Sequence, residues 1–154
     1  MTGEVFEYRA TVRPEWIDYN GHMQDAYYGL VFSHAVDAFQ DAVGFDASYR
    51  AGTGCTIYLV EDHKYFLSEV TEGQEIRVLT RLIGLWEKRF HLWSEMTAGG
   101  GSVAVAEMIQ MHVRRHPGPK SAPIPRSIAR RLTRALTPTG EIGALGPRAR
   151  AMGD

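Results

Sequence analysis

The chain has 154 residues, of which 44% are hydrophobic and 23% are charged, a composition typical of one globular domain. Its single cysteine, Cys55, excludes an internal disulfide, and no apolar run is long enough to cross a bilayer. The N-terminal residues lack the basic and apolar regions of a secretory signal, so we expect a cytoplasmic protein.

The first two elements are an alternating strand and a long helix. Apolar residues alternate along Val5–Arg13, which predicts a strand that Pro14 ends. From about Gln24 to Val43, apolar residues recur at helical spacing around most of the surface, which predicts a mostly buried helix. Gly44 is placed to end that helix.

Four further segments alternate in the manner of strands. They are Thr56–Leu67, Gln74–Leu85, Lys88–Ala98 and Ser102–Arg114. The turns between them are short, so we expect consecutive strands to be antiparallel neighbours. This order predicts an α+β fold in which a five-stranded antiparallel sheet packs on one long helix. Because the edges of the sheet remain open, we also expect pairing between subunits.

The rest of the chain is short of apolar residues. Pro125 precedes an apolar stripe that predicts a short helix over Arg126–Leu136. We expect residues 137–154 to form a flexible tail, which leaves residues 1–136 as the folded domain. From Arg114 onward, nine Lys and Arg residues accompany two acids. Such a basic end either binds a phosphate-rich ligand or is solvated, and we favour solvation.

A carboxylate and a glycine stand directly before the long helix. Asp18 is either a turn acid or a catalytic carboxylate, because a helix N-terminus offers unpaired N–H groups that can polarise a carbonyl. Gly21 permits a tight turn. His22 is either an acid–base group or a residue that holds the loop, and we favour the second interpretation because no nucleophile pairs with it in the sequence. Asp25 either complements the helix dipole or is a second acid in a pocket.

Other candidates lie on the second predicted strand and among the aromatic residues. Alternation places Glu61 and His63 on one side of their strand with Ile57 and Leu59, so they are either partly buried against the helix or ordinary surface groups. The aromatic residues belong to the core or an interface, or in part form a cage for a quaternary ammonium group. The six histidines form no metal-binding motif, so we expect no metal site. The aromatic residues concerned are Trp16, Tyr19, Tyr27, Tyr28, Tyr58, Tyr65, Trp86 and Trp93.

The stretch from Asp18 to Tyr28 resembles the Asp-x-x-Gly-His-x-x-x-x-x-Tyr signature of hotdog-fold acyl-CoA thioesterases of the 4-hydroxybenzoyl-CoA thioesterase type. The resemblance covers most of the chain, roughly from Tyr8 to Leu132. It implies the hotdog fold, in which a five-stranded antiparallel sheet wraps around one long central helix. Further matching stretches are Tyr58–His63, Glu72–Gln74 and Ala122–Pro125.

Within this family the chain resembles the betainyl-CoA thioesterase branch, an activity found alone or fused to carnitine dehydrogenase. Many relatives carry two Asn residues where this chain has Gln24 and Asp25, and an acid at position 25 suits a cationic acyl group. The stretches that carry this likeness are Val12–Met23, Val36–Phe39 and Glu87–Leu92.

The resemblance implies hydrolysis of an acyl-CoA thioester to the free acid and CoA. Betainyl-CoA, in carnitine or betaine metabolism, is the first expected substrate, and an aromatic or short- to medium-chain acyl-CoA is the alternative. Asp18 would be the nucleophile or the base that activates water, and the N–H of Asp25 would polarise the carbonyl. The expected substrate-binding residues are Trp16, Gly21, His22, Met23, Tyr28, Glu61 and His63, and the expected CoA-binding residues are Lys88, Arg89 and Arg115.

The resemblance also implies an assembly. Such enzymes are homodimers or dimers of dimers with a shared pocket, so we expect Glu61 or His63 of one chain to face Asp18 of another. No metal, redox cofactor, nucleic acid or membrane partner is implied. A non-catalytic acyl-CoA-binding hotdog protein, with a basic end that touches nucleic acid, is the remaining alternative.

Overall fold

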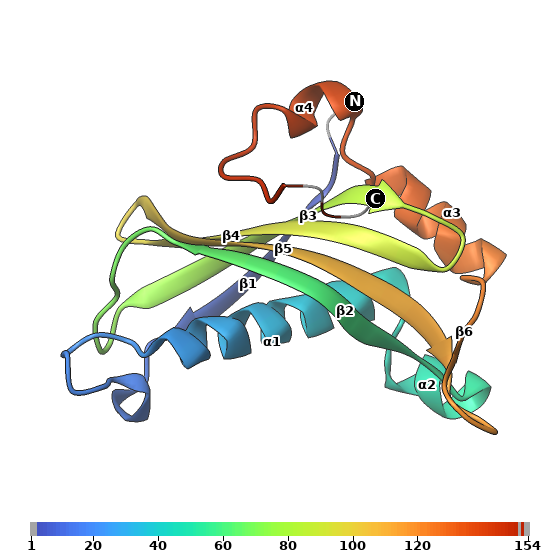
Figure 1. Ribbon diagram of the computed structural model, residues 1–154, viewed down its shortest axis with the longest axis horizontal. Helices are drawn as coiled ribbons and strands as arrows, with labels where there is room; N and C mark the ends of the chain where they lie inside the picture. The colour runs from blue at the N-terminus through green and yellow to red at the C-terminus, as the bar shows by residue number, and fades with distance from the viewer. Residues whose placement is uncertain (1–2, 151, 153–154) are drawn as a thin grey trace.

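A strongly curved antiparallel sheet wraps around one long helix in the computed structural model, which describes residues 3–150 and 152 (Figure 1). The helix is α1 (Asp25–Val43), and the strand order across the sheet is β1-β3-β4-β5-β2, with the short β6 paired to β5. All pairings are antiparallel, which confirms the α+β prediction. The strands are β1 (Val5–Thr11), β2 (Cys55–Phe66), β3 (Glu75–Leu85), β4 (Arg89–Ala98), β5 (Gly101–Arg114) and β6 (Lys120–Ser121).

The core lies between α1 and the concave face of the sheet. Phe39 is fully buried and packs edge-on against Phe6 of β1, with ring centroids 4.7 Å apart. The ring of Phe90 of β4 also lies next to Phe39, with centroids 5.8 Å apart. The predicted end of the helix is confirmed, because Gly44 adopts a left-handed conformation with φ of 112° and its N–H bonds the carbonyl of Gln40.

The expectation that every short turn joins neighbouring strands is wrong for the turn at Gly73. β2 lies at one edge of the sheet beside β5, whereas β3 lies between β1 and β4. The turn is fixed to the end of β1 instead, because the N–H of Gly73 donates to Val12 and the N–H of Val12 donates to Gln74, both at 2.9 Å. The connection from β2 to β3 is therefore a crossover, which leaves β2 as an open edge.

Four short helices complete the chain. Two of them, η1 (Pro14–Trp16) and α2 (Ala47–Thr53), occupy regions expected to be loops, and Asp46 caps α2 by accepting from the N–H of Tyr49 at 2.9 Å. The third, α3 (Arg126–Ala135), confirms the predicted short helix. The fourth, α4 (Thr139–Ile142), lies in the region expected to be a flexible tail.

The described part of that tail packs on the sheet, contrary to expectation. We call residues 137–150 the C-terminal segment and the sheet face opposite α1 the outer face (Figure 1). The indole N–H of Trp93 donates to Pro147 at 3.0 Å, and the hydroxyl of Tyr65 donates to Arg148 at 2.9 Å. The segment covers apolar side chains of the outer face, which would otherwise be exposed to water. Residues 151, 153 and 154 of the predicted tail lie outside the described residues.

Of the nine basic residues from Arg114 onward, seven are exposed, as the preference for solvation predicts, and two are partly buried ion-pair partners. Arg131 of α3 makes two hydrogen bonds to Glu4, at 2.8 and 2.9 Å, and Arg148 binds Glu107 of β5 at 2.6 Å. Among the described helices, none is both long and apolar enough to span a bilayer.

Candidate active site

The loop before α1 is a tight, hydrogen-bonded turn. The N–H of Asp18 donates to His22 and the N–H of Gly21 donates to Asp18, both at 3.0 Å. Gly21 has φ of 82°, a value that side chains other than glycine rarely adopt. The Asp18 carboxylate is half-buried and accepts a hydrogen bond from the N–H of Asn20 at 2.8 Å. The turn therefore holds the Asp18 carboxylate in one orientation. Both a turn acid and a catalytic acid need such a fixed orientation.

The first residue of α1 presents an unpaired backbone donor. Gln24, which precedes it, is extended with φ of −62° and ψ of 144°, and its side chain caps nothing. The Asp25 carboxylate accepts from the N–H of Ala26 at 3.0 Å. Within the described part of the chain, the N–H of Asp25 itself has no acceptor. An unpaired donor at the positive end of a helix is suited to polarise a carbonyl oxygen.

Asp25 lines two adjoining cavities. One, of about 320 Å³, is lined by Met23, Asp25, Tyr28 and residues 66–69. The other, of about 500 Å³, is lined by Asp25, Ala26 and Gly29 of the helix and by side chains of β2. Asp25 and Phe66 belong to both linings, so they form the wall that the two cavities share.

The residues after β2 hold the start of α1 in place. The buried Met23 donates its N–H to Val70 at 2.9 Å. His22 contacts Glu69, with Nε2 and Oε2 3.0 Å apart. Tyr28 donates its hydroxyl to the carbonyl of Ser68 at 3.2 Å, and burial raises the pKa of this phenol, which keeps it neutral as a donor. These three contacts fix the end of the loop and the start of α1 to the segment between β2 and β3.

The side of β2 that faces α1 differs from the sequence prediction. The strand register shifts between Leu59 and Glu61, so Val60 is an extra residue in a β-bulge. Because of this bulge, Glu61 and His63 lie on the outer face with Tyr65 as exposed groups, and not on the side of Ile57 and Leu59 as alternation predicted. That one of them faces Asp18 of a second chain stays a prediction.

Asp62 and Lys64 occupy the helix-facing side instead. They form an ion pair with Nζ and Oδ2 2.5 Å apart, and both line the 500 Å³ cavity. Gly29 of α1 lies beside the lysine, and a Cβ there would make an ordinary van der Waals contact, 3.6 Å from Cε of Lys64. Sequence alternation could not identify these two residues, since a bulge reverses which residues share a face.

The expected CoA-binding residues lie at the other end of the sheet. The carbonyl of Lys88 accepts from His112, and the N–H of Arg115 donates to Gly54, close to the C-terminal end of α1. Arg89 stacks on the Trp86 ring, with its guanidinium carbon 4.6 Å from the ring centroid. Within one chain, these residues are not brought together with Asp18 and Asp25.

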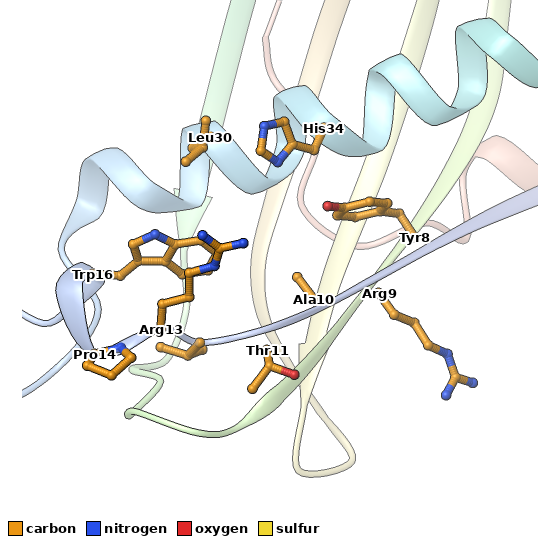
Figure 2. Close-up of a pocket in the computed structure, with 10 residues that line it drawn as sticks. Tyr8, Arg9, Ala10, Thr11, Arg13, Pro14, Trp16, Leu30 and His34 are labelled. Atoms are coloured by element: carbon orange, nitrogen blue, oxygen red, sulfur yellow. The ribbon is translucent and has the colours of Figure 1, made fainter.

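Trp16 also lines a different cavity from Asp25. A groove of about 470 Å³ runs between β1 and α1, and Figure 2 shows Arg13 over the Trp16 ring, with His34 of the helix near Tyr8 of the strand. The buried Trp16 stacks on Tyr27, with centroids 5.7 Å apart. Its contact with the site is therefore indirect, through Tyr27 and through its carbonyl, which accepts from the N–H of Gln24 at 2.9 Å.

The chain belongs to the Thioesterase-like superfamily, whose model matches residues 12–132. It is 39% identical over 134 residues to a betainyl-CoA thioesterase of Pseudomonas aeruginosa, and the match covers 86% of this chain and 84% of that protein. It is also 40% identical over 107 residues to an L-carnitine dehydrogenase/betainyl-CoA thioesterase of Agrobacterium fabrum, covering 69% of this chain and 22% of that longer protein.

Solved structures agree with this assignment. A putative thioesterase from Pseudomonas putida KT2440 superposes with a TM-score of 0.78 at 34% identity, covering 100% of this chain and 96% of that one. A Staphylococcus aureus protein solved in complex with CoA superposes with a TM-score of 0.83 at 29% identity, covering 90% and 89%. The fold is therefore the expected hotdog fold, and the protein is a thioester hydrolase that acts on acyl-CoA.

Proposed function

We propose that the protein hydrolyses betainyl-CoA to betaine and CoA, with Asp18 and the N–H of Asp25 as the catalytic groups. Two observations support this proposal. The first is the similarity to the Pseudomonas aeruginosa betainyl-CoA thioesterase over most of both chains. The second is that the N–H of Asp25 has no acceptor among the described residues, while Asp25 lines a cavity and follows the turn that holds the half-buried Asp18.

In this reaction the thioester carbonyl oxygen accepts a hydrogen bond from the N–H of Asp25. This contact stabilises the negative charge that develops on the oxygen when the carbonyl carbon is attacked, and the helix dipole adds to the effect. Collapse of the tetrahedral species breaks the C–S bond. CoA leaves as a thiolate and takes up a proton, and the acyl group acquires the hydroxyl of water.

Asp18 supplies the carboxylate that starts the reaction by one of two routes. As a base, it removes a proton from the attacking water. As a nucleophile, it forms a mixed anhydride that water then hydrolyses. Rapid-quench measurements separate the routes: release of CoA before betaine, with an acylated protein mass, identifies the nucleophile, and simultaneous release with unmodified protein identifies the base.

We further propose a cytoplasmic homodimer joined through β2. This strand is an open edge of the sheet and carries exposed apolar side chains, among them Tyr58, Val60 and Phe66. Antiparallel pairing of two β2 edges would place the Cys55 end of one copy beside the Phe66 end of the other. Lys88, Arg89 and Arg115 of the second copy would then approach the mouth of the Asp25 cavities, where they could bind the CoA phosphates. No metal or redox cofactor takes part in the proposed reaction.

A substrate panel tests the proposed function. The purified protein is assayed for thiol release from betainyl-CoA, benzoyl-CoA, butanoyl-CoA and octanoyl-CoA. The highest kcat/KM is expected for betainyl-CoA. A higher value for benzoyl-CoA or a straight-chain thioester would assign the protein to the alternative substrate class. Tight binding of all four without thiol release would identify an acyl-CoA-binding protein.

A further inference from the structure

Two aromatic rings and two carboxylates line the cavity of about 320 Å³ at the start of α1, with Phe66 54% exposed and Tyr28 only 4% exposed. Tyr28 and Phe66 meet edge to face, with ring centroids 5.3 Å apart and an interplanar angle of 87°. Asp25 lies at the helix end of the cavity and Glu69 at its rim. Two perpendicular rings beside a carboxylate form a surface that attracts a cation which cannot donate hydrogen bonds, because the faces of aromatic rings are negative.

One acid in the lining of the two cavities has no basic side chain as a neighbour. Glu69 lies beside the imidazole of His22, and Asp62 is paired with Lys64. Asp25, in the wall between the cavities, has no cationic side chain as a partner among the described residues. Its negative charge is free to interact with a ligand that enters either cavity.

Asp25 also links the cation to the reacting bond. Its backbone N–H is the proposed donor to the thioester carbonyl, and its carboxylate belongs to the same residue. In a betainyl group, one methylene separates the carbonyl carbon from the quaternary nitrogen. A carbonyl held on the N–H of Asp25 therefore keeps the trimethylammonium group close to the carboxylate and to the rings of Tyr28 and Phe66.

We propose that Asp25, Phe66 and Tyr28 form the subsite that binds the trimethylammonium group of the acyl substrate. This inference rests on the proposed function. The subsite selects charge as well as size: the rings contact the methyl groups, and the Asp25 carboxylate stabilises the positive charge. Phe66 is more than half exposed in a single chain, so the β2 edge of a second copy would close the subsite and exclude water. Excluding water strengthens both the cation–ring and the charge–charge attraction.

The test compares betainyl-CoA with 3,3-dimethylbutanoyl-CoA, in which carbon replaces the quaternary nitrogen. The two acyl groups have nearly the same shape and differ in charge. The measured quantity is the ratio of kcat/KM for betainyl-CoA to kcat/KM for the neutral thioester. For the wild-type protein we expect a ratio of about ten or more.

Variants of two subsite residues test whether the subsite causes the preference for betainyl-CoA. Asp25→Asn keeps the backbone N–H and removes the charge, and we expect the ratio to fall about tenfold. Phe66→Leu removes the ring and should lower the ratio several-fold, whereas Phe66→Tyr keeps the ring and should retain it. Asp41→Asn is the matched control, because it removes an acid from the far end of the same helix and should leave the ratio at the wild-type value.

The outcomes separate this inference from the proposed function. A wild-type protein that hydrolyses both thioesters equally well would overturn the cation subsite and leave the thioesterase assignment intact. A wild-type preference for betainyl-CoA that persists in both Asp25→Asn and Phe66→Leu would place the cation elsewhere. Failure of the wild-type protein to hydrolyse betainyl-CoA would overturn the proposed substrate itself.

Discussion

Arg148 of the C-terminal segment binds Glu107 of β5 through two hydrogen bonds, at 2.6 and 3.3 Å, and the Glu107 side chain is only 1% exposed. The N–H of Ala149 donates to the same carboxylate at 3.1 Å, and His91 of β4 lies 2.9 Å away on its other side. A buried carboxylate requires such partners, because a charge without them is costly in the protein interior. The C-terminal segment is thus attached to the outer face through a charged group within the sheet.

Replacing Arg148 should therefore destabilise the fold. We expect Arg148→Ala to lower the free energy of unfolding by about 2 kcal/mol, because it leaves the Glu107 charge with too few donors. Urea unfolding followed by circular dichroism measures the change. Arg150→Ala, an exposed neighbour, is the control and should stay within about 0.5 kcal/mol of the wild type. Equal stability of the two variants would show that the segment does not support the sheet.

His91 makes the same cluster sensitive to acid. Burial lowers the pKa of His91, and the Glu107 carboxylate opposes that shift only in part, so the neutral ring donates to Glu107 at pH 7. In the unfolded chain histidine takes up a proton near pH 6.5, whereas the folded protein binds it only at lower pH. Protons therefore favour the unfolded state, and stability falls as the pH drops below about 6.5.

The Glu107 carboxylate causes a further loss of stability at lower pH. Burial raises the pKa of Glu107, but hydrogen bonds from Arg148 and Ala149 outweigh that effect and leave the pKa below its ordinary value. The stability that this carboxylate contributes is lost as the pH falls through its folded pKa. Urea midpoints of the wild type and of His91→Gln between pH 7.5 and 5 measure the first step. The variant should show a shallower loss, and an identical loss would contradict the assignment to His91.

The sequence predicts the elements of this fold well because their periodicity is local. Apolar spacing from Tyr28 to Val43 marks the one helix that the sheet encloses, and Gly44 ends it as expected. The position of β2 at the sheet edge could not be predicted from local periodicity. The turn at Gly73 is short, but its sequence does not determine which strands pair. Strand order depends on contacts between residues distant in sequence, which alternation within one strand does not encode.

The candidate site shows the same division. Asp18, Gly21 and Asp25 lie within one turn and one helix start, so a short motif and helix electrostatics indicate them. Asp62 and Lys64 were missed because a single extra residue, Val60, reverses the faces of β2. The C-terminal segment was missed because two isolated apolar residues, Ile142 and Leu145, pack on the outer face, and its hydrogen bonds come from backbone carbonyls and Arg148, so no apolar periodicity marks it in the sequence.

The proposed dimer predicts that a charge placed on the β2 edge separates the two subunits. Val60 is 51% exposed at the bulge of this strand. Val60→Lys should place like charges across a two-fold axis and remove apolar contact, so the protein should become monomeric. Light scattering after size-exclusion chromatography measures the mass. Val5→Lys, on the exposed edge strand at the opposite side of the sheet, is the control and should remain dimeric. Dissociation by Val5→Lys alone would place the interface at β1.

Asp18→Asn tests the catalytic carboxylate without altering its shape. The amide oxygen can still accept from the N–H of Asn20, so the turn should persist. The amide can neither remove a proton from water nor attack the carbonyl, and we expect kcat to fall about 100-fold or more. Thermal unfolding should match the wild type within a few degrees. Wild-type turnover in this variant would return Asp18 to the role of a turn acid.

Asp25 allows its backbone donor to be removed by a side-chain substitution. It is the first residue of α1, a position that tolerates proline, and Gln24 before it already has the extended conformation that proline requires of its neighbour. Because the N–H of Asp25 has no acceptor within the described chain, Asp25→Pro removes no backbone–backbone hydrogen bond. It does remove the bond from the N–H of Ala26 to the Asp25 carboxylate. The comparison variant is Asp25→Ala, which also lacks the carboxylate but keeps the N–H. With 3,3-dimethylbutanoyl-CoA as a neutral substrate, we expect kcat of Asp25→Pro to be about 100-fold below that of Asp25→Ala. Equal kcat values in two equally stable variants would mean that another group polarises the thioester carbonyl.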